Sequence, residues 1–161
     1  MKELFDKIST YNIFNYLLPG ILFVVFCKYF IGYTFILEDD FLGAFLYYFI
    51  GMVISRFGSL IVEPFLKWIN FLKFEDYKKY IIASQKDHKI ELFSEISNTY
   101  RTITSLFVLL ILVKIYYSFD IKYNFANPIA YTTITIILLF LFLLSYRKQT
   151  NYISKRIKSN S

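Results

Sequence analysis

The segment 41–63 constrains the fold more than any other stretch, because it is apolar almost throughout and long enough to cross a bilayer as a helix. It also contains Arg56 and Glu63, which are seven positions apart and therefore on nearly the same helix face. Charged groups inside a span are costly in lipid and usually face protein or water at functional sites. We therefore expect both residues to line a helix interface, a polar path or a gate. In the alternative interpretation, Arg56 extends to the headgroups and Glu63 lies at the membrane surface.

Small residues follow one face of the same segment, namely Gly51, Ser55, Gly58 and Ser59. A small-xxx-small pattern lets a second helix approach closely in a membrane. This packing face could serve helices of the same chain or contacts between copies of the chain.

Three further apolar stretches accompany it, at residues 16–37, 102–119 and 129–146. The chain is 57% hydrophobic, above the roughly 45–50% of ordinary soluble domains. Only 5 Gly and 3 Pro interrupt its 161 residues, which favours long helices. The sequence predicts an all-α, polytopic membrane protein of one domain (1–161), with four transmembrane helices.

The second and third spans are separated by residues 64–101, which predict a helical cytosolic extension. Pro64 is expected to kink or end the preceding helix, and the polar run 85–89 is expected to form a turn. Apolar residues at helical spacing then run from about 90 to 118 without a break, predicting a single helix that protrudes from the bilayer. A basic cytosolic tail, 147–161, completes the chain.

The distribution of Lys and Arg predicts the orientation. These residues gather in the amino-terminal segment, in 64–101 and in the tail, whereas the two short loops carry only Lys122. Cytosolic loops carry the excess of positive charge. We therefore expect a multi-pass protein of the bacterial inner membrane with both termini in the cytosol.

The residues needed for common catalytic or metal sites are scarce. Cys27 is the one cysteine and His88 the one histidine, so a cluster of such ligands cannot form within a chain. A glycine-rich phosphate loop is also absent from the sequence. We expect no catalytic residue, no metal and no cofactor. Lys28, in the first span, joins Arg56 and Glu63 as a pore or gate candidate, with extension toward an interface as the alternative.

Basic residues of the extension could bind an anionic ligand such as a nucleotide or oligonucleotide. The candidates are Lys78, Lys79, Lys86, Lys89 and Arg101. The charges of the tail could bind anionic membrane lipid. Retention of the topology alone explains both sets equally well.

Three segments together resemble small four-span membrane proteins of bacterial anti-phage defence loci: YNIFNYLLPG at 11–20, GMVISRFGSLIVEPFLK at 51–67 and SNTYRT at 97–102. In the Hailong-type system, a nucleotidyltransferase product controls a tetrameric channel of this kind. The resemblance implies an effector that depolarises the inner membrane on a signal from a partner. It carries no defined ligand residue to this chain.

The sequence therefore leaves two alternative functions for the protein. One is a homo-oligomeric, ion-conducting membrane effector that a cytosolic partner protein or nucleotide-type signal gates through residues 64–101. The other is a non-conducting membrane anchor or accessory subunit that recruits a cytosolic partner through the same region.

Overall fold

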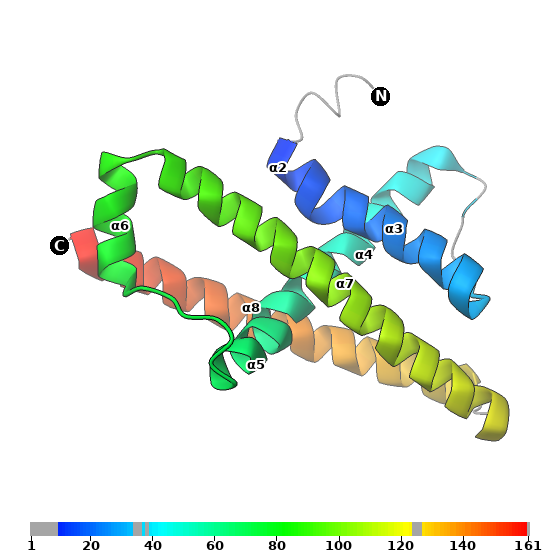
Figure 1. Ribbon diagram of the computed structural model, residues 1–161. Helices are drawn as coiled ribbons and strands as arrows, with labels where there is room; N and C mark the ends of the chain where they lie inside the picture. The colour runs from blue at the N-terminus through cyan, green and yellow to red at the C-terminus, as the bar shows by residue number, and fades with distance from the viewer. Residues whose placement is uncertain (1–9, 34–36, 38, 124–126, 161) are drawn as a thin grey trace.

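The computed structural model describes residues 10–33, 37, 39–123 and 127–160, and this part of the chain consists of helices and turns without strands (Figure 1). Lys2 and Lys7, which contribute to the predicted orientation, lie outside these residues. Within the described ranges, four helices are long and apolar enough to cross a membrane: Ile13–Ile31, Asp40–Trp68, Lys89–Ile121 and Thr132–Lys158. The all-helical prediction is confirmed, together with the four apolar helices, while insertion in a membrane stays a prediction.

The first apolar helix is built from alternating α- and π-helical pieces. In order they are α2 (Thr10–Asn12), η1 (Ile13–Leu17), α3 (Leu18–Phe26) and η2 (Cys27–Ile31). Gly32 follows in the left-handed region, with φ of 97°, a conformation that ends a helix at little cost only in glycine. The helix therefore starts earlier and ends earlier than the expected span at 16–37.

The second apolar helix begins at α4 (Asp40–Phe57), where the Asp39 carboxylate accepts hydrogen bonds from the backbone N–H groups of Phe41 and Leu42. This cap satisfies donors that the first turn leaves unpaired. The helix continues through η3 (Gly58–Val62) into α5 (Glu63–Trp68).

Two of the π-helical turns precede a proline. η1 ends two residues before Pro19, and η3 ends two residues before Pro64. Proline lacks a backbone donor and its ring collides with the carbonyl four residues earlier. A wider turn in front of the ring relieves that collision, which gives a reason for both π-helical turns. Of the two outcomes expected at Pro64, a kink or an end, the end is wrong, because the helix continues to Trp68.

The remaining elements are α6 (Tyr77–Lys86), α7 (Lys89–Tyr123) and α8 (Asn127–Asn160). The turn expected at 85–89 falls between α6 and α7 as predicted. At 1.5 Å per residue, the 35 residues of α7 extend about 50 Å, well beyond a hydrocarbon core of ~30 Å. The long helix expected at about 90–118 is thus confirmed, with five more residues at its carboxyl end.

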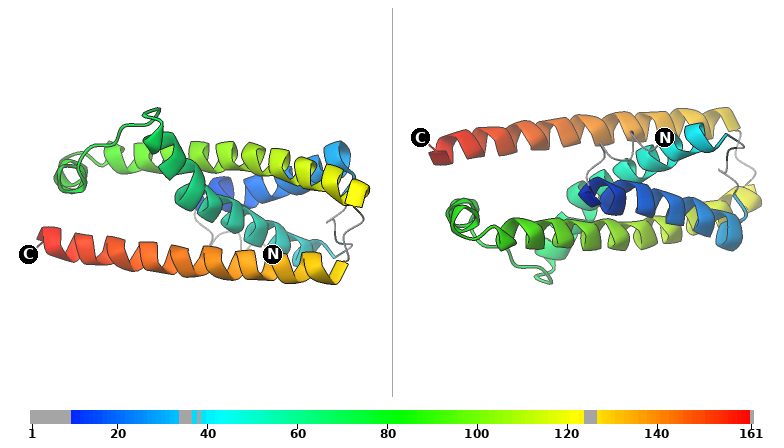
Figure 2. Two further views of the ribbon diagram at one scale, coloured as in Figure 1. Left: turned by 90° about the horizontal axis from the view of Figure 1, so that it is seen from below. Right: turned by 90° about the horizontal axis from the view of Figure 1, so that it is seen from above.

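The helix ends that flank the two short connections lie at the same end of the bundle (Figure 2). Near that end, the ring of Tyr33 after η2 meets the ring of Tyr117 in α7 at 5.1 Å between centroids. At the opposite end, α6 lies beside the last turns of α8, where Tyr77 stacks on Tyr152 at 6.3 Å (Figure 1). The insertion and the carboxyl terminus therefore share one end, as a four-span topology requires.

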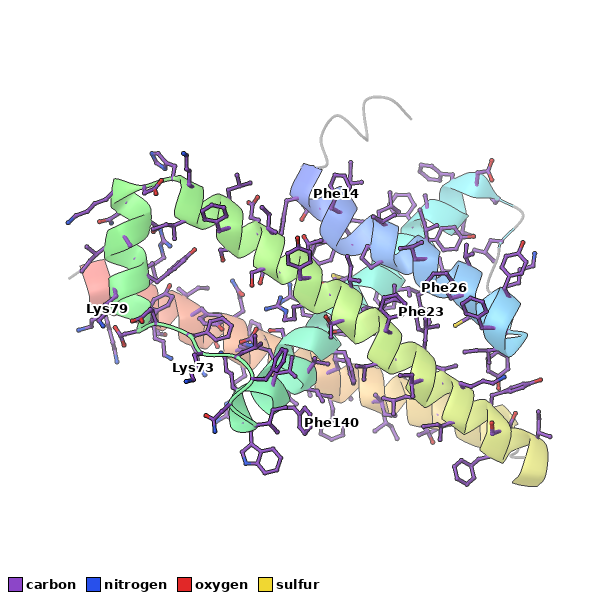
Figure 3. The ribbon with its side chains drawn as sticks, in the orientation of Figure 1. Phe14, Phe23, Phe26, Lys73, Lys79 and Phe140 are labelled. Carbon is purple, nitrogen blue, oxygen red and sulfur yellow. The ribbon has the colours of Figure 1, made fainter. Side chains whose placement is uncertain are left out.

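The helix formed by α4, η3 and α5 is the centre of the packing, and it crosses between α7 and α8 (Figure 2). In contrast, α8 buries only a narrow stripe that contains Leu141 and Ser145. Its other faces carry exposed apolar side chains such as Phe140, which projects from the outer side of the helix (Figure 3). Such surfaces suit contact with lipid or with further protein.

Candidate functional site

A line of small and polar residues runs along the inner face of the central helix. Gly51, Ser55, Ser59 and Glu63 are all buried and follow one another at intervals of four residues. Residues four apart lie one above another on the same helix face. This line, called the polar stripe below, is the feature that the other helices approach.

The part of the polar stripe around Ser55, called its upper part below, is a network of hydrogen bonds. The Thr102 hydroxyl of α7 donates to Asn15 Oδ1 of η1 at 2.8 Å, and it lies 3.3 Å from Ser55 Oγ. Asn15 Nδ2 donates to Ser55 Oγ at 3.4 Å. All three side chains are buried, and buried polar groups are stable only when they are paired in this way. The network fixes three helices against one another.

The lower part of the polar stripe centres on the Glu63 carboxylate. Lys67 Nζ donates to Oε1 at 2.8 Å, and Arg101 Nη1 donates to Oε2 at 2.8 Å. The Glu63 side chain is 9% exposed and that of Arg101 is 21% exposed. Because Glu63 directly precedes the insertion and Arg101 is its last residue, their ion pair joins the two ends of residues 64–101.

Lys148 of α8 extends this cluster to the fourth helix. Its Nζ donates to the Ser59 carbonyl at 2.6 Å and lies 2.7 Å from Ser59 Oγ. Electrostatically it is attracted by Glu63 and repelled by Arg101, Lys67 and Arg56. The group of Glu63, Lys67, Arg101 and Lys148 is called the charge cluster below.

Arg56 turns toward protein as well. Its Nη2 donates to the Tyr16 hydroxyl at 3.3 Å, and the Tyr16 ring packs edge-on against Tyr48 at 5.5 Å. Tyr11 lies beside Tyr16 at 6.5 Å between ring centroids. Burial, reinforced by that neighbouring ring, raises the pKa of the Tyr11 hydroxyl above its usual value, so this group stays neutral. Arg56 thus contacts the first apolar helix of the same chain, while its role in a polar path or gate stays a prediction.

Lys28 lies apart from these groups. It belongs to η2 at the end of the first helix, is exposed, and its Nζ is 5.8 Å from the ring centroid of Tyr29. The sequence placed Lys28 near the middle of a span. In the single chain it lies one turn from the helix end and contributes nothing to the polar stripe.

The small residues of the packing face serve contacts within the chain. A Cβ on Gly51 would overlap the Tyr16 carbonyl, and one on Gly58 would overlap Ser105 Oγ. Ser55 and Ser59 bond to Thr102 and Lys148 as described above. The intramolecular alternative therefore accounts for all four residues.

Four of the five residues expected to bind an anionic ligand lie on α6 or at the start of α7, and Arg101 follows about three turns further along α7. Lys78, Lys79 and Lys86 are exposed on α6, Lys89 is exposed at the start of α7, and Arg101 is held by Glu63. Lys79 also pairs with the exposed Glu75 at 3.3 Å. Figure 3 shows Lys79 and Lys73 at the α6 end of the bundle.

Sequence reasoning missed Asn15, Lys67, Thr102 and Lys148 as members of the site. A signal for Lys148 is present, because Leu141, Ser145 and Lys148 follow each other at helical spacing and all turn inward. Asn15 and Thr102 carry no comparable signal, since each looks like an ordinary cap or span boundary.

The described residues contain no group of three His, Cys, Asp or Glu side chains able to hold a metal ion. No family model, characterised protein or solved structure matches the chain. The function must therefore be argued from the polar stripe and the charge cluster.

Proposed function

We propose that the protein is a membrane effector that assembles from identical copies into an ion-conducting pore of the bacterial inner membrane. In this proposal residues 64–101 receive the gating signal from a partner protein or a nucleotide-type ligand. The resemblance to small effectors of anti-phage loci supplies the biological setting.

The charge cluster is the observation that carries this proposal. Its charged side chains lie on three helices long and apolar enough to cross a membrane, and Glu63 and Arg101 pair with each other in a largely buried position. Arg56, seven residues before Glu63, likewise bonds to another helix, through the Tyr16 hydroxyl. Ionisable groups inside apolar helices are expensive and are typical of ion paths and gates.

The position of the Glu63–Arg101 ion pair supplies a gating device. The pair closes the base of the insertion, so a ligand or partner that moves α6 pulls directly on α5 and α7. Lys148 transmits the same movement to α8 through Ser59. A shift of one helix would therefore alter contacts on all the others along the polar stripe.

Several copies are needed for conduction in this proposal, because side chains fill the interior of one bundle with hydrogen bonds and close helix contacts. The exposed apolar faces of α7 and α8, with Phe107, Ile111 and Phe140 among their residues, leave room for further copies. Closed cyclic symmetry is the usual arrangement of such assemblies.

The test measures ion flux in liposomes that contain the purified protein, with a voltage-sensitive dye and a potassium gradient. Glu63→Gln removes the carboxylate charge that holds Lys67 and Arg101, so we expect flux at least about tenfold above that of the wild type. Glu75→Gln, which alters an exposed pair, should behave like the wild type.

The mass of the assembly in detergent is measured on the same preparations, and it should be a multiple of the 19.3 kDa chain. A monomer, or the absence of flux from both the wild type and Glu63→Gln, would contradict the pore.

A membrane anchor is the second candidate, and the exposed lysines of α6 favour it because they present a charged surface to a soluble partner. Arg56→Leu and Glu63→Ala discriminate between the two functions. A change in ion flux, in either direction, with the assembly intact supports the pore. Loss of cellular activity only on changes in 64–101 outside the charge cluster supports the anchor.

A further inference from the structure

The charge cluster carries more positive than negative charge. Lys67, Arg101 and Lys148 surround the single carboxylate of Glu63, and Arg56 adds a further cation within electrostatic reach of Lys148. One carboxylate cannot neutralise these groups, and their mutual repulsion opposes the packing of α5, α7 and α8. An anion between the helices would remove that repulsion.

Arg101 has hydrogen-bonding capacity beyond its bond to Glu63. Its Nε is buried and has no hydrogen-bond partner among the described residues. A guanidinium offers five N–H donors in a planar fork that matches the oxygens of a phosphate. Lys67 remains 42% exposed beside it, so the cluster is open to a ligand on one side.

The surroundings of the charge cluster are those of a membrane interface. The segment that follows Glu63 carries exposed aromatic rings at Phe65, Trp68, Phe71 and Phe74, with Trp68 78% exposed. Lys67 Nζ lies 3.9 Å above the ring of Phe74. Aromatic belts of this kind lie at headgroup depth, and basic pockets between helices at that depth bind lipid phosphates.

We infer that Lys67, Arg101 and Lys148 form a binding site for a phosphate-bearing anion that bridges α5, α7 and α8. The headgroup of an anionic lipid and free phosphate share this chemistry. The site goes beyond the proposed pore, because binding requires no conduction, and its failure would leave the flux experiment unaffected.

The test measures the melting temperature of the full chain in detergent during titration with phosphatidylglycerol, phosphatidylcholine or inorganic phosphate. We expect an anionic ligand to stabilise the wild type. Lys148→Gln or Lys67→Gln should each weaken the apparent affinity about fivefold or more, because one basic residue near a membrane surface contributes on the order of 1 kcal/mol.

The matched control is Lys155→Gln, which removes the same charge from an exposed position of α8 outside the cluster and should keep the wild-type affinity. Stabilisation by phosphatidylglycerol alone identifies a lipid headgroup, and stabilisation by inorganic phosphate identifies a soluble source. Two results overturn the site. One is the absence of stabilisation by either anion, and the other is an equal loss of affinity in Lys155→Gln and Lys148→Gln.

Using two variants covers the case in which Lys148→Gln fails to fold for lack of its bonds to Ser59. Lys67→Gln then carries the test, because Lys67 is the more exposed member of the cluster and bonds only to a residue of its own helix in the described structure.

Discussion

Gly20 of α3 and Gly51 of α4 mark a close crossing of the first two apolar helices, at which each glycine lies against backbone of the other helix. A Cβ on Gly20 would overlap the Tyr47 carbonyl, and one on Gly51 would overlap the Tyr16 carbonyl. Backbone cannot move aside as a flexible side chain can. This crossing brings Asn15 within hydrogen-bonding distance of Ser55 and so builds the upper part of the polar stripe.

The crossing predicts that Gly51→Ala destabilises the bundle by about 1–3 kcal/mol, the usual cost of overpacking a well-filled interface. The melting temperature of the purified protein in detergent measures this loss. Gly43→Ala is the matched control in the same helix, because its new methyl group would meet Tyr47 at an ordinary contact distance of 3.5 Å. Equal melting temperatures for the two variants would contradict the crossing.

The charge cluster predicts non-additive effects of Glu63 and Arg101. Glu63→Ala leaves Arg101 and Lys67 without their carboxylate, which should cost about 3 kcal/mol or more. Adding Arg101→Met removes the stranded guanidinium and should recover part of that loss. A double-mutant cycle on the free energy of unfolding measures the coupling. Coupling near zero would show that the pair contributes nothing to the packing of α5 against α7.

The sequence alone predicted the long central helix, because segment 41–63 is apolar and its small residues lie at intervals of four. It also predicted α7 as one long helix and a turn at 85–89 before it. The π-helical turns before Pro19 and Pro64 were not predicted, since local patterns do not show how a proline clash is relieved.

Parts of the site were missed because they depend on contacts between helices that are far apart in the sequence. Whether Asn15 or Thr102 faces the polar stripe depends on the crossing at Gly20 and Gly51, which is a tertiary contact. Lys148 was assigned to the basic tail, where its charge matched its neighbours, although helical spacing places it with Leu141 and Ser145. Positions within a helix were readable from the sequence, but the partners across the bundle were not.

The buried hydrogen-bond network predicts that a Thr→Val substitution lowers the stability of the protein by different amounts at two positions of α7. Thr102→Val removes a hydroxyl that bonds to Asn15 and lies close to Ser55, leaving both partners buried and incompletely paired. We expect Thr102→Val to lower the free energy of unfolding by about 1–3 kcal/mol. Thr104→Val should change stability by less than about 0.5 kcal/mol, because Thr104 is exposed and its hydroxyl bonds only to the Tyr100 carbonyl of its own helix. Chemical or thermal unfolding of both variants in detergent checks this contrast, and a larger loss for Thr104→Val would contradict the assigned network.

The distribution of basic residues predicts which end of the bundle faces the cytosol. Lys86 and Lys155 lie at the end that carries α6, whereas Asp40 lies at the end of the short connections, and all three are exposed. In variants that each carry one introduced cysteine at these positions, a membrane-impermeant maleimide should label Asp40→Cys on intact spheroplasts. It should label Lys86→Cys and Lys155→Cys only after permeabilisation, because chain ends rich in Lys and Arg stay in the cytosol. The native Cys27 is buried and should give little background, which Asp40→Cys in a Cys27→Ala chain can verify. The reverse labelling pattern would place α6 outside the cytosol, and a cytosolic signal could then no longer reach the base of the insertion at Glu63 and Arg101.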